Sequence, residues 1–384
     1  MDAFAHPPGA KSAWSYYYFS IVFAVIAIGI GALIGGPTTA LTVAVLTVLE
    51  VSLSLDNAVV NAKILENWDA RWRKIFLFWG ILIAVFGMRL VFPIIIVSFA
   101  TGLSPVAVTQ MALFDENQYT QHLTAAHHQV AGFGGAFLMM VALGFFFQER
   151  HVYWLEWAES RLAKLGQIEA VSAAVTLGAL FLAKSFVIPD KQAEFFNAGI
   201  LGVILFVVVH GLGSLVGPED EDDDESTPAT VGPTHAIVRQ GAMGFLYIEI
   251  LDASFSFDGV IGAFALSKYL PVIMLGLGAG AFFVRAATVH LVETKALAEF
   301  PYVEHGAFLA ILVLASIMMM PEAHIPEWFT GLSGAAILAF AFWRSVAKNK
   351  RDSVEAVHKA MVDGGFPADP FKRGQMRGET ARQA

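Results

Sequence analysis

Long apolar stretches constrain this chain more than any other feature of its sequence. Several reach the length of about 20 residues that spans the roughly 30 Å hydrocarbon core of a bilayer. Charged residues make up only 15% of the chain, whereas a soluble domain carries about 25%. The sequence therefore predicts an all-α polytopic membrane protein with about ten transmembrane helices. We expect these helices near residues 16–37, 39–62, 75–99, 131–148, 169–188, 196–216, 240–266, 270–292, 305–320 and 328–345.

Lysine and arginine in the short connections indicate the orientation, because they accumulate on the cytoplasmic side of a membrane. Basic residues occur in 63–74, in 149–166 and in 344–351, whereas 101–130 contains none. All three basic segments lie on one side if both termini are cytoplasmic. We therefore expect a multi-pass protein of the cell inner (plasma) membrane, with 101–130 outside.

A polar stretch inside the second apolar segment recurs later in the chain. Residues 49–60 read LEVSLSLDNAVV, and residues 251–262 read LDASFSFDGVIG. Two further landmarks follow each copy in the same order. One is a glycine and an arginine separated by eight residues, ending at Arg89 and at Arg285, and the other is the sequence GAFL. The helices two to four and seven to nine thus form two repeats. Their odd offset of five helices inverts the second repeat, an architecture common in secondary transporters.

The positions of the two repeats divide the rest of the chain into expected segments. An acidic run over 219–225 predicts a disordered cytoplasmic linker. Residues 149–166 carry apolar residues at helical spacing with two tryptophans, which predicts an interfacial helix. The expected segments are 1–38 with the first span, 39–148 as the first repeat with an external insertion at 101–130, 149–217 with the interfacial helix and two linking spans, 218–237 as the acidic linker, 238–320 as the second repeat, 321–345 as the last span, and 346–384 as a cytoplasmic tail.

Polar side chains within the two copies fall on shared helical faces. In the first copy one face carries Glu50, Ser54, Asn57 and Asn61, and the adjacent face carries Ser52 and Asp56. In the second copy the corresponding faces carry Glu249, Asp252 and Ser256, with Ser254 and Asp258 beside them.

Two interpretations of these carboxylates stay open. A charged residue at the bilayer centre costs roughly 2.5–3.5 kcal/mol on insertion scales, so it normally has a partner or a function. A structural ion-pair network is one reading, in which Arg89 and Arg285 pair with Asp56 and Asp258, or with Glu50 and Asp252. Ion transport is the other, because five acids exceed two arginines and the surplus suits a divalent cation. Oxygen ligands favour Mg²⁺, Ca²⁺ or Mn²⁺ over zinc or copper.

Other classes of function find little support in the sequence. The chain has no cysteine, so disulfides, thiolate sites and iron–sulfur clusters are excluded. A net charge of −9 without a basic face argues against nucleic acid. No metalloprotease, nucleophile-elbow or phosphate-loop motif occurs, so we expect no enzyme, no catalytic residue and no tightly bound cofactor. His122, His127 and His128 lie in the insertion, either as an accessory metal site or as part of a solvated loop.

The duplicated motif, with SLDNA and SFSFDGVIGAFA followed by GLGAGAFFVR and YVEHGAF, resembles the TerC integral membrane family. The similarity covers roughly 39–345 and is greatest to a bacterial branch labelled a domain of unknown function. That family is named for tellurium resistance, and some relatives are implicated in manganese efflux. The resemblance implies an exporter of Mn²⁺ or another hard divalent cation as the transported ion. By motif position, the implied metal ligands are Glu50, Asp56, Asn57, Asp252 and Asp258. The neighbouring polar residues Ser52, Ser54, Ser254, Ser256, Glu249, Asn61, Arg89 and Arg285 would support them.

A second class of function remains open beside the exporter. The chain could be a membrane scaffold for cytoplasmic stress-response proteins, with the acidic linker and the basic tail as contact surfaces. The lipid bilayer is the expected environment in both cases, and the sequence leaves a homo-oligomer open.

Overall fold

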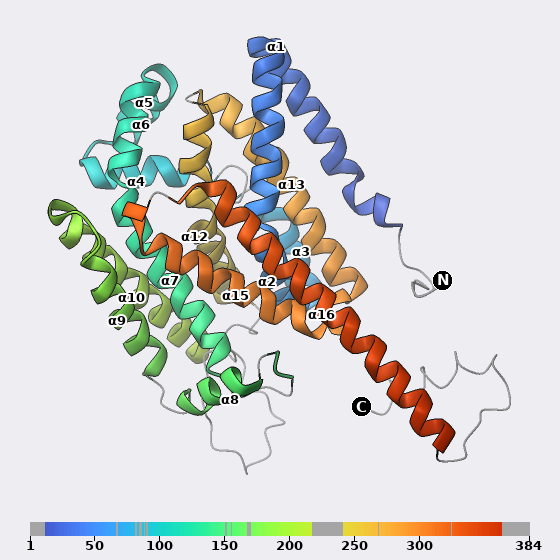
Figure 1. Cartoon of the computed structure of the whole chain (residues 1–384). Coiled ribbons are helices and arrows are strands. Elements are labelled where there is room, and N and C mark those ends of the chain that lie inside the picture. Colours follow the sequence, from blue (N-terminus) through green and yellow to red (C-terminus); the bar gives the residue numbers. More distant parts are fainter. Residues whose placement is uncertain are drawn as a thin grey trace.

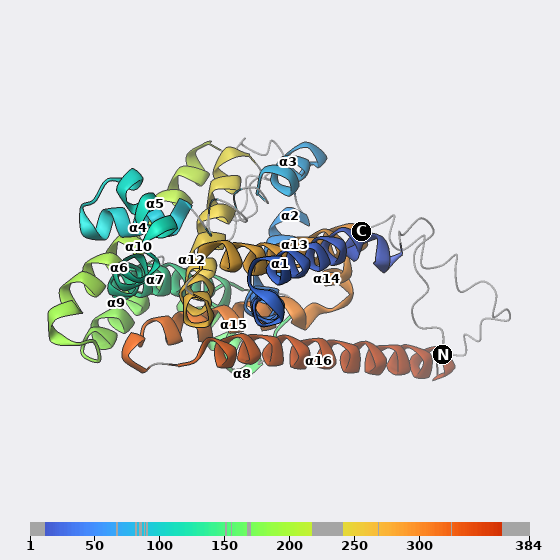
Figure 2. The same cartoon turned by 90° about the horizontal axis from the view of Figure 1, so that it is seen from above.

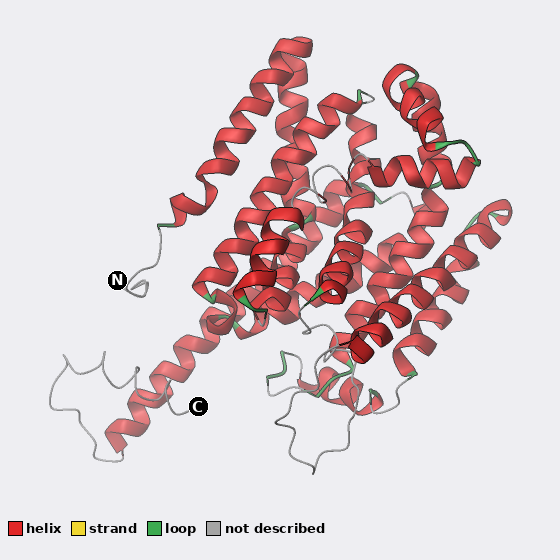
Figure 3. Ribbon diagram, turned by 180° about the vertical axis from the view of Figure 1, so that it is seen from behind, coloured by secondary structure: helices red, strands yellow, loops and turns green. Residues whose placement is uncertain are grey.

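The computed structural model describes residues 12–66, 68–80, 83, 87, 89, 91–149, 152–154, 156–166, 170–216, 241–267, 269–323 and 325–362. Within these residues every regular element is a helix and none is a strand (Figure 3). The expected linker 218–237, the first residues 1–11 and most of the expected tail, 363–384, lie outside the described residues. The α-helices are α1 (Ala13–Leu53), α2 (Leu55–Glu66), α3 (Ala70–Ile75), α4 (Phe92–Thr101), α5 (Pro105–Phe114), α6 (Glu116–Ala125), α7 (His127–Phe146), α8 (Glu156–Leu165), α9 (Val171–Lys184), α10 (Gln192–Val216), α12 (Ala242–Leu266), α13 (Leu270–Thr294), α14 (Ala296–Glu299), α15 (Pro301–Met318) and α16 (Glu327–Val362).

Short elements of other geometry join some of these helices. A π-helix, η1 (Phe76–Gly80), follows α3, and 3-10 turns precede α10 (η3, Pro189–Lys191) and follow α15 (η4, Pro321–Ala323). The span expected at 75–99 is therefore not one regular α-helix. It begins with the π-turn η1 and continues into α4 after a segment of which only some residues are described.

The longest helix, α1, is two limbs rather than one rod. Gly35 and Gly36 have non-helical backbone angles, with Gly36 at a φ of 75°, and Pro37 follows them. A β-carbon built at Gly31 would lie 2.9 Å from Val43 Cγ2, so the two limbs fold back against each other near the bend. Figure 1 shows the limbs meeting at the top of the molecule. The two limbs correspond to the spans expected at 16–37 and 39–62, except that the second limb ends at Leu53 and α2 continues after Ser54.

Length and apolar composition identify a multi-pass membrane protein. Among the described residues, six helices are long and apolar enough to cross a bilayer: α1, α7, α10 with η3, α13, α15 and α16. Large apolar side chains are exposed on the outer helices, including Leu33 on α1, Leu182 on α9 and Trp343 on α16. Such exposure suits a lipid-facing surface, because lipid tails solvate apolar side chains as well as a protein core does.

The interior is built around α7, α12, α13 and α15. Helix α7 packs mainly against α10 and α15, and α1 packs mainly against α13. Two clusters of buried apolar residues result, one centred on α7, α12 and α15 and the other on α1, α6 and α13. Viewed from above, α9 and α10 lie at one edge and α16 runs along another (Figure 2).

Helices α7 and α15 run antiparallel where they meet. Along α7 and α15, which carry the two GAFL sequences, a β-carbon at Gly135 would lie 3.3 Å from the Ala315 carbonyl oxygen, whereas Phe145 stacks on Phe308 at 3.9 Å. A later residue of α7 therefore contacts an earlier residue of α15, which means that the two helices run in opposite directions. The same holds for α12 and the first polar stretch, as the site geometry below shows.

The peripheral segments differ from what the sequence suggested. The insertion 101–130 is not an open loop, because α5 and α6 fold within it and bury Val108, Tyr119 and Leu123. The expected interfacial helix 149–166 is shorter, beginning only at α8. The last expected span, 328–345, continues as one helix to Val362, so the start of the expected tail is an extension of α16 that leaves the bundle (Figure 1).

Candidate functional site

A cavity of about 60 Å³ with both polar and apolar walls lies among the end of α1, α2, η1, α12 and α13. A buried water needs roughly 10–15 Å³ of such space, so the cavity has room for several waters or for a partly hydrated ion. We call it the main cavity. Its polar lining consists of Glu50, Ser54, Asn57, Asn61, Arg89, Asp252, Ser256, Arg285 and Thr288.

Glu50 is the most enclosed carboxylate of this lining, with 2% of its surface exposed. Arg89 Nη2 donates to its Oε1 in a buried ion pair, and Ser54 Oγ donates to the same oxygen at 2.9 Å. Helix α13 approaches closely at Gly280, where a β-carbon would lie 2.5 Å from Glu50 Cβ and Cγ. The pairing of Arg89 with Glu50, one of the two arrangements expected from sequence, is confirmed.

Asp252 on α12 is held by two amides of α2. Asn61 Nδ2 donates to Asp252 Oδ1 at 2.9 Å, and Asn57 also donates to this carboxylate. At the other end of the contact, a β-carbon at Gly259 would lie 3.6 Å from Glu50 Oε2. Position 50 thus meets 259 while position 61 meets 252, so the two copies of the polar stretch run antiparallel. The contact between Asn57 and Asp252 mirrors the contact between Gly259 and Glu50, as the sequence alignment pairs them.

Three oxygen atoms of the main cavity have no hydrogen-bond partner within the described protein. They are Asn57 Oδ1, Asn61 Oδ1 and Ser256 Oγ, all of them buried. Both carboxylate oxygens of Glu249 are also buried and unpartnered, and Glu249 Oε1 would lie 3.1 Å from a β-carbon at Gly80 on the cavity wall. Buried polar atoms are almost always satisfied. These oxygens are therefore available to water or to a cation.

The charges that line the main cavity balance. Glu50 and Asp252 supply two carboxylates, and Arg89 and Arg285 supply two guanidinium groups. Arg285 Nε donates to the Leu77 carbonyl oxygen at 3.0 Å. Glu249 adds a third carboxylate next to the wall. The surplus of negative charge in the cavity is therefore smaller than the count of five acids against two arginines suggested.

Several expected site residues lie elsewhere. Asp56 and Ser52 line a second, smaller cavity on the opposite side of α2. Ser254 Oγ donates to the Ile250 carbonyl oxygen within α12 and is not part of either lining. Asp258 lies on α12, but its side chain is outside the described residues. The structure therefore brings together Glu50, Asn57 and Asp252 of the five implied ligands, and it separates Asp56 from them.

Clusters of strong metal-binding side chains do not occur in the part of the chain that is described. No three histidine, aspartate or glutamate side chains there lie close enough to hold a metal ion. A hard cation in the main cavity would need amide and hydroxyl oxygens beside its two carboxylates, which is a ligand set that Mg²⁺, Ca²⁺ and Mn²⁺ accept. Thr288 is a lining residue that sequence reasoning missed, although its position three residues after Arg285 on α13 places it on the same helical face.

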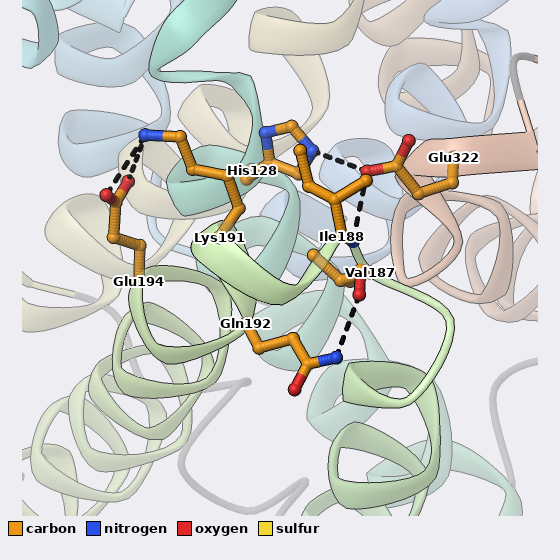
Figure 4. A network of polar contacts seen from close by, with 7 residues as sticks. All are labelled: His128, Val187, Ile188, Lys191, Gln192, Glu194 and Glu322. Atoms are coloured by element: carbon orange, nitrogen blue, oxygen red, sulfur yellow. Dashed lines mark hydrogen bonds and ion pairs between the residues drawn. The ribbon is translucent and has the colours of Figure 1, made fainter.

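His128 takes part in a polar network between helices (Figure 4). His128 Nε2 lies 2.8 Å from Glu322 Oε1 on η4, and the Ile188 backbone N–H donates to the same carboxylate oxygen at 3.5 Å. Lys191 pairs with Glu194 at 3.0 Å beside it. His122 lies on α6 and His127 begins α7. These contacts tie α7 to η3 and η4, which gives His128 a structural role.

A comparison with models of protein families gives a match. The model of the family described as "Protein of unknown function (DUF475)" matches residues 55–352. This range holds α2, α12 and α13, and so most of the main cavity. No curated protein and no solved structure matches the chain.

Proposed function

The chain belongs to the DUF475 family of proteins of unknown function, and on that premise we propose that it is a membrane transporter that exports hard divalent cations, with Mn²⁺ as the first candidate. The observation that carries the proposal is the main cavity itself. Two carboxylates and three unpartnered buried oxygens face one space inside a bundle of apolar helices. Ionisable residues at membrane depth usually mark an ion or substrate pathway.

The repeat architecture supports this proposal. Inverted repeats place equivalent helices antiparallel around a pseudo-two-fold axis, with the binding site at the repeat interface. Both pairs of equivalent helices that touch here run antiparallel, and the main cavity lies where the two polar stretches meet. We therefore propose two inverted three-helix repeats within a set of about ten spans, with both termini cytoplasmic in the inner membrane.

Arg89 has a defined part in this mechanism. While no cation is bound, its guanidinium neutralises Glu50 and keeps the buried carboxylate from standing alone. A divalent cation that binds between Glu50 and Asp252 would compete with Arg89 for Glu50. Neutral oxygens of Asn57, Asn61, Ser54 and Ser256 would replace part of the ion's hydration shell. With Glu249 counted, three carboxylates and two guanidinium groups give a net charge of −1 without the ion and +1 with it.

The identity of the ion rests on oxygen chemistry and on resemblance. Oxygen donors without thiolate or clustered imidazole suit Mn²⁺, Mg²⁺ and Ca²⁺. The similarity to the TerC family, some of whose relatives are implicated in manganese efflux, favours Mn²⁺ among them. In this proposal the metal is cargo rather than a resident cofactor.

The balanced charges of the main cavity support a second candidate function. Two arginines against two carboxylates can also form a purely structural network, in which case the protein would act as a scaffold for tellurite- or metal-stress proteins. The two functions predict that different parts of the chain tolerate mutation without loss of activity. A transporter depends on the carboxylates of the main cavity, whereas a scaffold depends on cytoplasmic segments such as 218–230.

Cellular metal content under manganese load separates the two functions. Cells that express the wild-type chain should hold less manganese than cells without it, and Glu50→Gln should abolish that difference. Deletion of 218–230 should leave export intact. Export that survives Glu50→Gln but disappears with the deletion would reject the transporter in favour of the scaffold, once the amount of each variant in the membrane is verified.

A further inference from the structure

The second cavity has properties of its own. It lies between the end of α1, the start of α2, α15 and α16, and its volume is about 10 Å³, which is enough for a single water-sized occupant. We call it the Asp56 cavity. Its lining consists of Ser52, Leu53, Asp56, Phe255, Ala310, Leu314, Thr330, Ser333 and Gly334.

Asp56 is the only ionisable residue of this lining. It is 5% exposed, and Oδ1 accepts the Asn57 backbone N–H at 2.9 Å in the first turn of α2. Among the described side chains, no lysine, arginine or histidine forms an ion pair with it. The helix terminus stabilises this carboxylate in part, because the start of a helix carries partial positive charge. A full negative charge in the apolar interior nevertheless calls for a positive partner.

Neutral oxygens line the same cavity as Asp56. Thr330, near the start of α16, is 6% exposed, and its Oγ1 has no hydrogen-bond partner within the described protein. Ser333 Oγ donates its hydrogen to the Thr330 carbonyl oxygen, so its lone pairs remain available as acceptors. Ser52 lies close by, where a β-carbon at Gly331 would come within 2.9 Å of its Oγ. One carboxylate residue and three hydroxyl residues thus line a space for one small occupant.

We propose that the Asp56 cavity binds a single Na⁺ ion. One monovalent cation neutralises one carboxylate, whereas a divalent cation would leave an uncompensated positive charge in the apolar interior. The small volume favours Na⁺ over the larger K⁺. The site also lies at the break between α1 and α2, and interrupted helices are where membrane transporters hold their coupling ions. Binding at this site does not depend on whether the main cavity carries Mn²⁺.

The position of the Asp56 cavity links it to the main cavity. Phe255 is shared by both linings, and Asp56 and Asn57 are neighbours that face opposite cavities. An ion that draws Thr330 and Asp56 together would shift the start of α2, and with it the amide that donates to Asp252. This coupling, unlike Na⁺ binding itself, rests on the proposed transport function.

Thermal unfolding of the purified full-length protein tests the site. The unfolding midpoint should rise saturably with NaCl at constant ionic strength, with choline chloride as the replacement, because a ligand that binds only the folded state stabilises it. KCl should give a much smaller rise. Asp56→Asn, which keeps an acceptor for the Asn57 N–H, should lose the Na⁺ response, and Thr330→Val should reduce it. Ser316→Ala removes a hydroxyl of α15 that bonds to the Leu312 carbonyl and should keep the full response.

Three results would overturn the proposal. They are an equal response to NaCl and choline chloride, an undiminished Na⁺ response in Asp56→Asn, and a stability that follows pH without any response to Na⁺, which would identify a proton site instead. If Asp56→Asn does not fold, Thr330→Val decides, because it is nearly isosteric with the native side chain. An intact Na⁺ response in a protein that does not export manganese would contradict the proposed transport function and leave the Na⁺ site standing.

Discussion

Arg89 lies against Glu50 inside the helix bundle and donates from Nη2 to Oε1 of that carboxylate. The two side chains are 5% and 2% exposed, so neither charge is solvated by bulk water. Glu50 lies on α1, Arg89 lies in the segment between η1 and α4, and Gly280 of α13 covers the glutamate. The pair therefore joins three helical segments at the wall of the main cavity.

Replacing Arg89 by leucine should destabilise the protein strongly. The change leaves Glu50 buried without its cationic partner, and breaking a buried pair from one side costs about 3–5 kcal/mol. We expect low yield and a lowered unfolding midpoint in thermal denaturation. Arg285→Leu is the matched control, because Arg285 is less buried and its described hydrogen bond is to the Leu77 carbonyl, so it should cost less. A wild-type unfolding midpoint for Arg89→Leu would show that the pair is not structurally important.

Gly280 should tolerate no side chain. A β-carbon there would lie 2.5 Å from two carbons of Glu50 and 3.0 Å from the Thr47 carbonyl oxygen, so Gly280→Ala forces α13 away from α1. Overpacking of this kind costs about 1–3 kcal/mol. Gly178→Ala provides the control, because nothing lies within 4 Å of its built β-carbon. Thermal unfolding should separate the two variants, and equal midpoints would disprove the close approach of α13 to Glu50.

Cysteine labelling tests the orientation, since the chain has no native cysteine. Gln118 on α6 and Asp352 near the end of α16 are both exposed. If 101–130 is external and α16 ends in the cytoplasm, an impermeant thiol reagent applied to intact cells should label Gln118→Cys and spare Asp352→Cys. After the membrane is opened, both should react. Labelling of only Asp352→Cys in intact cells would reverse the topology.

The sequence predicted the helical class because it depends on patterns that are local, whereas the inverted repeats stay a proposal. Apolar length sets the spans, and the recurrence of LEVSLSLDNAVV as LDASFSFDGVIG marks equivalent helices. The pairing of Arg89 with Glu50 was one of two expected arrangements. The sequence could not choose between them, because the choice depends on how α13 and η1 pack around α2.

Other features depend on packing and were beyond sequence reasoning. Helical spacing placed Asp56 on the face next to the one that carries Asn57, and the two faces line different cavities. The resemblance by motif position had grouped Asp56 with the main site, and it carries no information on which cavity each face meets. Thr330 belongs to α16, outside both repeats, so no repeat signal could identify it. The insertion 101–130 contains two capped helices, with Ser104 and Asp115 as N-caps, which are local signals that the reading as a loop overlooked.

Mn²⁺ flux into liposomes that contain the purified protein tests the central claim most directly. We expect the wild-type protein to carry Mn²⁺ faster than empty liposomes do, and Asp252→Asn to reduce that rate about tenfold or more, because it removes a charged ligand. Two serines of α12 provide a matched pair: Ser256→Ala, in the main cavity, should slow transport, and Ser254→Ala, whose hydroxyl bonds to the Ile250 carbonyl, should not. Wild-type flux in Asp252→Asn, or no flux above empty liposomes in the wild type, would contradict the account.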